Sequence, residues 1–155
     1  MISREARTVW DGDLVDGSGN VSGMSGAMDK LPVTFKSRIG SPDGRTSPEE
    51  LIAAAHSSCF SMALANLLTQ EGHPPAHLDV TADVTLDDTS GAPTITASAL
   101  KVTGRVDGLD AAALQEVADR AGAACPVSRA LASVNITVQA TIGLGIAHRT
   151  EQPAV

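Results

Sequence analysis

The chain has 155 residues, a formal net charge of −7 at pH 7, and few aromatic side chains, namely one Trp, two Phe and no Tyr. This acidity argues against nucleic acid and against an anionic membrane surface as partners, since phosphate binding requires clustered Lys and Arg. The length predicts one domain with a core of Ala, Val, Leu and Ile. The charged N-terminus has no apolar segment typical of a signal peptide, so we expect a cytoplasmic protein.

The N-terminal quarter is predicted to form strands. Residues 33–39 alternate, with Phe35 on one face and Arg38 on the other, which favours a strand with Arg38 facing solvent. The segment Gly17-Ser-Gly-Asn is predicted to be a hairpin turn, because it lacks the strand–turn–helix context of a dinucleotide-binding loop. The other predicted elements here are strands at 7–12 and 21–28, separated by a turn at 16–20, and a loop at 41–46.

A long helix is predicted next, because Ser47 fits its N-cap, Pro48 its first position and Glu50 a capping box. It should run to about Glu71 and stop at Gly72. Residues 51–70 carry no charged side chain, but the polar residues among them argue against a membrane-spanning helix. Because its side chains are apolar or small nearly all round, the helix should be central.

The C-terminal half is predicted to hold a hairpin, two helices and a last strand. Asp110 should cap a helix to about Ala123, and Cys125 should begin a short helix with Pro126 at its start. Segregated strands and helices indicate an α+β fold. The predicted strands are 77–88, 94–106 and 134–142, which gives one domain over 1–142 and a tail over 143–155.

Cys59 and Cys125 are the only cysteines and lie in distinct contexts. A buried helical cysteine is usually inert, but small neighbours around Cys59 leave room for a ligand or partner. Cys125 at a helix N-terminus would face free N–H groups, which stabilise a thiolate. An inert disulfide between them remains open, although cytoplasmic proteins seldom use structural disulfides.

Three other side chains are candidates for chemistry near Cys59. Glu49 lies ten residues before Cys59, about 15 Å along a helix, so it could serve the thiol only through an intermediary such as Arg38 or from a partner subunit. His56 lies three residues before Cys59 on the same helical face. It could act as a base in a Cys–His hydrolase, but a packed, hydrogen-bonded histidine is the more common case. The spacing of His and Cys gives little support for a zinc site.

The segment Thr46-Ser-Pro-Glu-Glu-Leu-Ile-Ala-Ala-Ala-His-Ser-Ser-Cys-Phe-Ser-Met-Ala-Leu resembles the signature of the OsmC family, which is related to the organic hydroperoxide resistance proteins. Ala124-Cys-Pro-Val-Ser resembles the second-cysteine motif of that family. Ala55-His56 is closer to the OsmC branch than to the hydroperoxide-resistance branch. Further similarity lies at Trp10-Asp-Gly-Asp, Gly19-Asn-Val-Ser, Phe35-Lys-Ser-Arg and Thr81-Ala-Asp-Val-Thr-Leu, so the resemblance spans about residues 6–142.

The resemblance implies that Cys59 is the peroxidatic cysteine and Cys125 the resolving one. It also implies that Arg38 activates the thiol and that Glu49 holds Arg38, which replaces the solvent-facing assignment of Arg38. The implied fold is an intertwined homodimer, with antiparallel sheets wrapped around central helices and sites at the dimer interface. Whether Glu49 serves the site of its own subunit or of its partner stays open.

The implied activity is reduction of organic hydroperoxides in oxidative or osmotic stress, with a lipoyl-type dithiol as reductant and no metal, haem or flavin cofactor. Two alternatives remain. A Cys–His hydrolase using His56 would keep turnover in Cys125→Ser. A non-enzymatic binding or redox-sensing protein would be oxidised without multiple turnovers.

Overall fold

The computed structural model of this chain describes residues 1–88 and 91–143. The chain divides into two compact units, Met1–Ile52 and the part from Ala53 onward, called here the N-terminal and the C-terminal unit. The prediction of one domain over 1–142 therefore stays a prediction, and most of the predicted tail lies outside the described residues.

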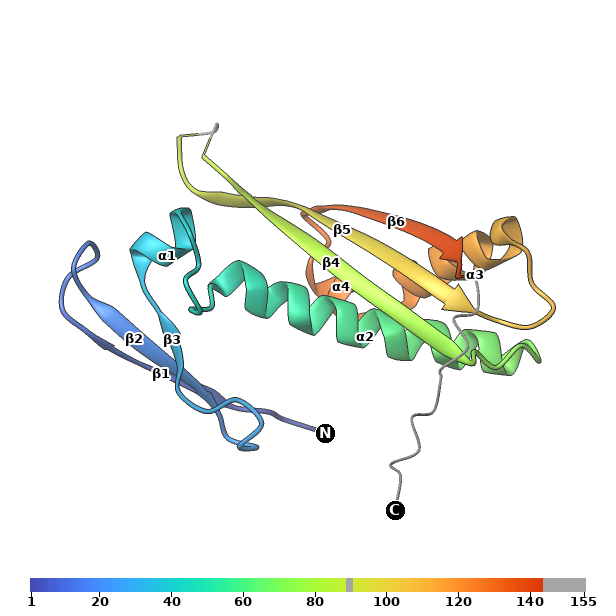
Figure 1. The fold of residues 1–155 in the computed structure, drawn as a ribbon, viewed down its shortest axis with the longest axis horizontal. Helices are drawn as coiled ribbons and strands as arrows, with labels where there is room; N and C mark the ends of the chain where they lie inside the picture. The colour runs from blue at the N-terminus through green and yellow to red at the C-terminus, as the bar shows by residue number, and fades with distance from the viewer. Residues whose placement is uncertain (89–90, 144–155) are drawn as a thin grey trace, which may run out of the picture. The chain divides into compact units, whose positions relative to one another are not determined.

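The N-terminal unit contains a three-stranded antiparallel sheet in the order β1-β2-β3 (Figure 1). Its strands are β1 (Ala6–Asp11), β2 (Ser18–Gly23) and β3 (Leu31–Val33). The turn between β1 and β2 lies earlier than predicted, because Asp13 Oδ1 accepts hydrogen bonds at 2.8 Å from the N–H groups of Val15 and Asp16. Such a local side-chain bond fixes the turn before Gly17. Gly17-Ser-Gly-Asn therefore leads into β2 and is not the turn itself.

The predicted strand at 33–39 is wrong, because β3 ends at Val33 and helix α1 covers Phe35–Ile39. Thr34 caps this helix, since its hydroxyl accepts the Ser37 N–H at 3.0 Å. In return, the Ser37 hydroxyl accepts the Thr34 N–H. A reciprocal cap of this kind satisfies N–H groups that a short helix cannot pair internally. Alternation over so short a segment did not distinguish the two structures.

The long helix α2 covers Pro48–Gln70, close to its predicted range. The Ser47 hydroxyl accepts the Glu50 N–H at 3.1 Å at its start. At its end Gly72 has φ +84°, and the His73 N–H donates to the Leu68 carbonyl at 2.8 Å. This pattern is a Schellman motif, which glycine allows at little steric cost. The predicted N-cap at Ser47 and the predicted stop at Gly72 are thus confirmed.

The C-terminal unit contains the sheet β4-β5-β6. β4 (His77–Asp87) and β5 (Thr94–Arg105) form the predicted antiparallel hairpin, whereas β6 (Asn135–Ile142) is parallel to β5. The expectation of purely antiparallel sheets is therefore corrected at β6. A parallel pair needs a long crossover, which here contains α3 (Ala111–Ala124) and α4 (Pro126–Ala130).

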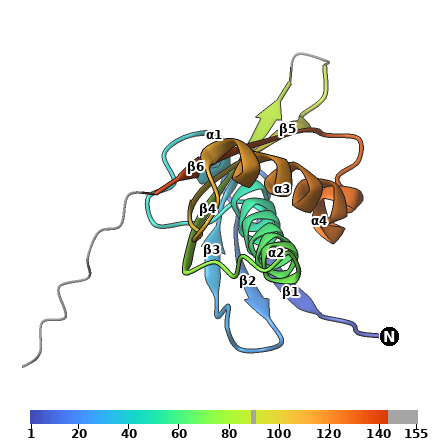
Figure 2. The ribbon, with the colours of Figure 1, turned by 90° about the vertical axis from the view of Figure 1, so that its right-hand side faces the viewer.

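The core of the C-terminal unit lies between its sheet and the helices α2 and α3, which lie side by side under the sheet when the unit is viewed along α2 (Figure 2). One face of α2 enters this core at a spacing of four residues, through His56, Phe60, Leu64 and Leu68, all of them fully buried. Other positions of α2 are exposed, with Met62 at 67%. In a single chain, therefore, α2 is buried on one face and not all round.

Among the described residues one helix, α2, is long and apolar enough to cross a membrane by length and composition. A core helix of a folded domain has the same properties. Because Phe60, Leu64 and Leu68 pack against strand and helix side chains of the C-terminal unit, α2 has the contacts of a core helix.

Candidate functional site

The structure holds the predicted site residues in two groups, one in each unit. The first joins Arg38 to Glu49 in the N-terminal unit, and the second joins Cys59 to Cys125 in the C-terminal unit.

Arg38 and Glu49 follow two segments that are paired through their backbones. Val33 and Thr46 form a parallel β-bridge, and the Thr46 N–H donates to the Pro32 carbonyl at 2.9 Å. Beyond this bridge one segment enters α1 and the other enters α2. The capped start of each helix therefore fixes where Arg38 and Glu49 extend their side chains.

The Arg38 guanidinium binds the Glu49 carboxylate through two nitrogens. Its Nη2 donates to Oε1 at 2.6 Å, and its Nε lies 3.1 Å from Oε1 and 3.2 Å from Oε2. The Glu49 side chain is 11% exposed and that of Arg38 30%. A two-pronged contact of this kind fixes the plane of the guanidinium, so Arg38 is held in one orientation.

The ion pair keeps both side chains charged. Burial alone would raise the pKa of the Glu49 carboxyl, but the hydrogen bonds and charge of Arg38, together with hydrogen bonds from the Glu49 N–H and from Ser47, hold this pKa below its usual range. The same hydrogen bond raises the pKa of Arg38. Arg38 also has N–H groups beyond those that face Glu49, and no hydrogen-bond acceptor among the described residues takes them.

Cys59 and Cys125 differ in exposure. Cys59 lies on α2 and is partly buried, whereas Cys125, between α3 and α4, is fully buried. Both belong to the hydrophobic core of the C-terminal unit, and neither forms a disulfide in this structure. A molecule that approaches from solvent therefore meets Cys59 first.

The two thiols influence each other, and the hydrogen-bond donors favour a thiolate at Cys125. Burial would raise its pKa, but the Ser128 N–H, the Cys59 thiol, the Ser128 hydroxyl and the Val127 N–H together lower it. The Cys125 side chain makes no capping hydrogen bond to the start of α4. Burial, together with the adjacent Cys125, raises the pKa of Cys59 despite a favourable Val127 N–H. The described surroundings of Cys59 in the C-terminal unit thus favour, on balance, its neutral thiol.

His56 is fully buried and its ring bridges two serines. Nδ1 lies 2.7 Å from the Ser98 hydroxyl and Nε2 lies 2.9 Å from the Ser128 hydroxyl. Burial lowers the pKa of the imidazole, so the ring is neutral at pH 7. With both nitrogens occupied, His56 is poorly suited to be the base of a Cys–His hydrolase.

The sequence alone did not indicate Ser98 or Ser128. Ser128 lies in the second-cysteine motif, so its position three residues after Cys125 was an available signal. Ser98 is a buried polar residue on a strand of β-forming residues, and such residues require a partner. Within residues 1–88 and 91–143 no group of three or more His, Cys, Asp or Glu side chains could hold a metal ion.

The chain thus carries two free cysteines of unequal exposure and an Arg–Glu pair held by hydrogen bonds. Comparison with known proteins identifies the family. Residues 40–140 match the family model described as OsmC-like protein. The chain is also 42% identical to "Peroxiredoxin OsmC" of Escherichia coli K12 over 130 residues, 84% of this chain and 90% of the relative. The chain belongs to the OsmC-like family.

Solved structures confirm the fold. An organic hydroperoxide resistance protein from Elizabethkingia anophelis is similar with a TM-score of 0.72 and 24% identity, over 94% of this chain and 98% of that one. OhrB of Bacillus subtilis, an organic hydroperoxide resistance protein, is similar with a TM-score of 0.66 and 24% identity, over 90% and 98%. The α+β, OsmC-like fold predicted from the sequence motifs is thus confirmed.

Proposed function

We propose that this protein is a thiol-dependent peroxidase that reduces organic hydroperoxides to alcohols in the cytoplasm, as part of defence against oxidative or osmotic stress. The support is its membership of the OsmC-like family and its 42% identity to a peroxiredoxin. The observation that carries the proposal is the partly exposed Cys59, which interacts with a fully buried second cysteine.

In the first step the Cys59 thiolate attacks the terminal oxygen of the hydroperoxide. The O–O bond breaks, the alkoxide takes up a proton and leaves as the alcohol, and Cys59 becomes a sulfenic acid. Cys125 then attacks the Cys59 sulfur, a disulfide forms and water leaves. The unequal exposure of the two thiols fits this order, since the exposed one meets the substrate and the buried one is protected from over-oxidation.

Arg38 is proposed to stabilise the Cys59 thiolate and the charge that develops on the leaving oxygen. This role is needed because the pKa of Cys59 is raised by its own surroundings in the C-terminal unit. Glu49 is proposed to hold the guanidinium in one orientation, as their two-pronged contact does within the N-terminal unit. Whether Arg38 and Glu49 serve the thiol of their own chain or of a partner belongs to the same proposal.

The active form is proposed to be a homodimer, with the exposed apolar part of α2 at its interface. The disulfide is proposed to be reduced by a lipoyl-type dithiol through thiol–disulfide exchange. The proposed chemistry proceeds through cysteine sulfur alone, without a metal, haem or flavin.

Steady-state turnover tests this function. Consumption of cumene hydroperoxide is followed with dihydrolipoamide as reductant, for the native protein and for Cys59→Ser and Cys125→Ser. We expect multiple turnovers that are lost in Cys59→Ser and limited to about one per chain in Cys125→Ser under dithiol-poor conditions. An active Cys59→Ser protein would contradict the proposal, and full turnover in Cys125→Ser would favour a one-cysteine peroxidase route.

A further inference from the structure

Strand β6 forms one edge of the sheet β4-β5-β6, and a side-chain amide occupies part of this edge. Gln115 of α3 donates from Nε2 to the Val138 carbonyl at 3.1 Å, and its Oε1 accepts the Ala140 N–H at 2.7 Å. The peptide groups of a neighbouring strand make the same two kinds of hydrogen bond with a sheet edge. The edge of β6 thus pairs with an amide at residues 138–140.

The same edge has backbone groups that Gln115 does not reach. The N–H and C=O of one strand residue point to the same side, and this side alternates along the strand. Because the Val138 carbonyl and the Ala140 N–H face the edge, the Val138 N–H and the Ile136 carbonyl face it too. Neither of these two groups has a hydrogen-bond partner within residues 1–88 and 91–143. Free donors and acceptors of this kind are a template for another extended segment.

A pocket of about 360 Å³ lies beside this free part of the edge, between α3, α4 and β6. Its volume is in the range of pockets that hold small ligands or side chains. The side chains of Ile136 and Val138 face the helices, where they pack against the core of the C-terminal unit. Every second side chain of a strand added to β6 would face the helices in the same way. The apolar residues that line the pocket are Gly122, Ala123, Ile136 and Val138.

Arg129 places an unpaired cation at this pocket. The other polar side chains that line it have partners, since Asp119 Oδ1 accepts Gln115 Nε2 at 2.8 Å and the Ser128 hydroxyl lies 2.9 Å from His56 Nε2. In the part of the chain that the structure describes, the exposed Arg129 guanidinium has no ion pair. A carboxylate is its complement, because the guanidinium fork matches the two carboxylate oxygens.

We propose that the free edge of β6 and this pocket, together called the β6 groove, bind an extended peptide segment of a partner protein that carries an acidic side chain. The segment pairs with the Val138 N–H and the Ile136 carbonyl, in line with the Gln115 amide, and its carboxylate binds Arg129. In such complexes the backbone bonds supply affinity, whereas the pocket and its charge select the side chains. The binding does not depend on the peroxidase activity proposed above.

Amide hydrogen exchange of the native protein tests the free edge first. We expect the Ala140 N–H to exchange about tenfold more slowly than the Val138 N–H, because only the Ala140 N–H donates to Gln115. Gln115→Leu is the matched variant, which should speed exchange at Ala140 and leave exchange at Val138 unchanged. A Val138 N–H as protected as that of Ala140 would overturn the proposal, because a second copy of this chain or another part of the fold would then cover the edge.

A peptide titration tests the binding itself. The probe is acetyl-Thr-Val-Val-Asp-amide, whose β-branched residues favour an extended chain, and the signals are the ¹H–¹⁵N shifts of the native protein. We expect saturable shifts at Val138 and protection of its N–H from exchange. The peptide with N-methylated valines, which cannot pair as a strand, should bind about tenfold more weakly. Absence of saturable shifts, or equal binding of the N-methylated peptide, would overturn the proposal.

The role of Arg129 is tested by a cycle of two peptides and two proteins. The peptide with Asn in place of Asp should bind the native protein about two- to five-fold more weakly, the effect of one exposed ion pair. Arg129→Gln should bind both peptides equally, since the cycle isolates the interaction between the two charges. Equal affinities of the two peptides for the native protein would contradict the acidic side chain in the proposed segment.

Discussion

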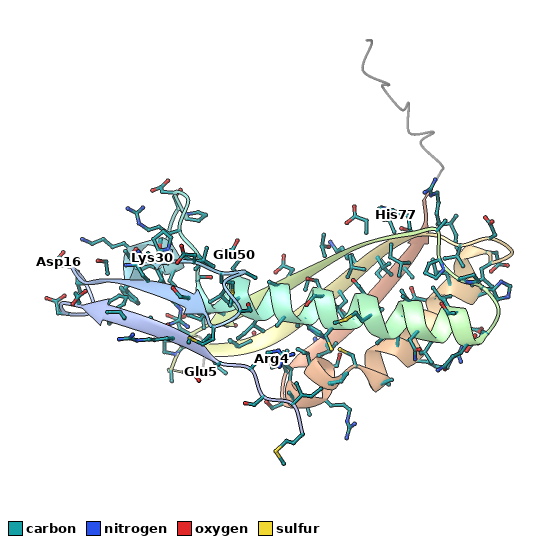
Figure 3. The ribbon with its side chains drawn as sticks, turned by 90° about the horizontal axis from the view of Figure 1, so that it is seen from below. Arg4, Glu5, Asp16, Lys30, Glu50 and His77 are labelled. Atoms are coloured by element: carbon teal, nitrogen blue, oxygen red, sulfur yellow. The ribbon has the colours of Figure 1, made fainter. Side chains whose placement is uncertain are left out.

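Arg38 shows how one side chain can be fixed by another that is far away in sequence. Glu49 lies eleven residues later, yet its carboxylate contacts two nitrogens of the guanidinium. Replacing Arg38 with Ala should lower kcat/KM for cumene hydroperoxide by about 100-fold, the typical loss when one preorganised donor to a developing charge is removed. Lys36→Ala is the matched control, because Lys36 belongs to the same helix but forms its ion pair with Asp16. Asp16, labelled in Figure 3, lies in the turn between β1 and β2. Equal losses in the two variants would contradict a specific role for Arg38.

The Arg38–Glu49 pair should also make stability depend on pH. Because the pKa of Glu49 is lowered in the folded protein, its contribution is present above the ordinary carboxyl pKa and is lost as pH falls through the folded value. Glu49→Gln should therefore cost about 1–3 kcal/mol near pH 7. The difference from the native protein should shrink towards zero in acid. Urea denaturation at pH 7, 5 and 3.5 measures it, and a difference that grows on acidification would contradict this assignment.

Helix α2 supplies both the first cysteine and much of the core of the C-terminal unit. Leu64 is fully buried against β5 and α3 side chains, and Leu64→Ala should lower the free energy of unfolding by about 2–5 kcal/mol. Gln70→Ala, an exposed change at the end of the same helix, should stay within about 0.5 kcal/mol. Both are measured by urea denaturation at one fixed protein concentration. A cost below about 1 kcal/mol for Leu64→Ala would contradict the assigned core.

At the scale of the elements, the sequence predicts correctly those helix starts and ends that short-range signals determine. The Ser47 and Asp110 caps and the Gly72 stop are short-range features, and all three lie where they were expected. The alternation over 33–39 predicts a strand, whereas the reciprocal hydrogen bonds between Thr34 and Ser37 start helix α1 there. The parallel position of β6 depends on a crossover of about thirty residues, for which no local pattern exists.

The candidate site also combines features that local sequence signals predict with contacts that only the folded chain forms. The two cysteine motifs could be predicted to be functional from the sequence, because each is one contiguous segment that is specific to the family. The contacts of His56 join residues 42 and 72 positions apart, and only the folded core brings them together. The contact between Arg38 and Glu49 was expected from family resemblance, whereas the alternation pattern pointed to solvent.

At the scale of the whole molecule, α2 leaves one large apolar side chain, that of Met62, exposed in a single chain. Met62 is 67% exposed in the middle of the helix, which a second chain would cover in the proposed homodimer. Met62→Glu should convert a dimer into a monomer at micromolar concentration, because it would bury an unpaired charge at the interface. Sedimentation velocity measures the change, and Ala112→Glu, an exposed change in the first turn of α3, is the control. A native protein that is monomeric at all concentrations would contradict the proposed dimer.

The central claim is that Cys59 and Cys125 form a redox pair. Intact mass measurement tests it most directly, on reduced protein before and after cumene hydroperoxide and again after dihydrolipoamide. The account predicts the loss of two hydrogens per chain on oxidation, full reversal by the dithiol, and no such loss in Cys59→Ser. An unchanged mass, or a stable gain of oxygen without a disulfide, would contradict it.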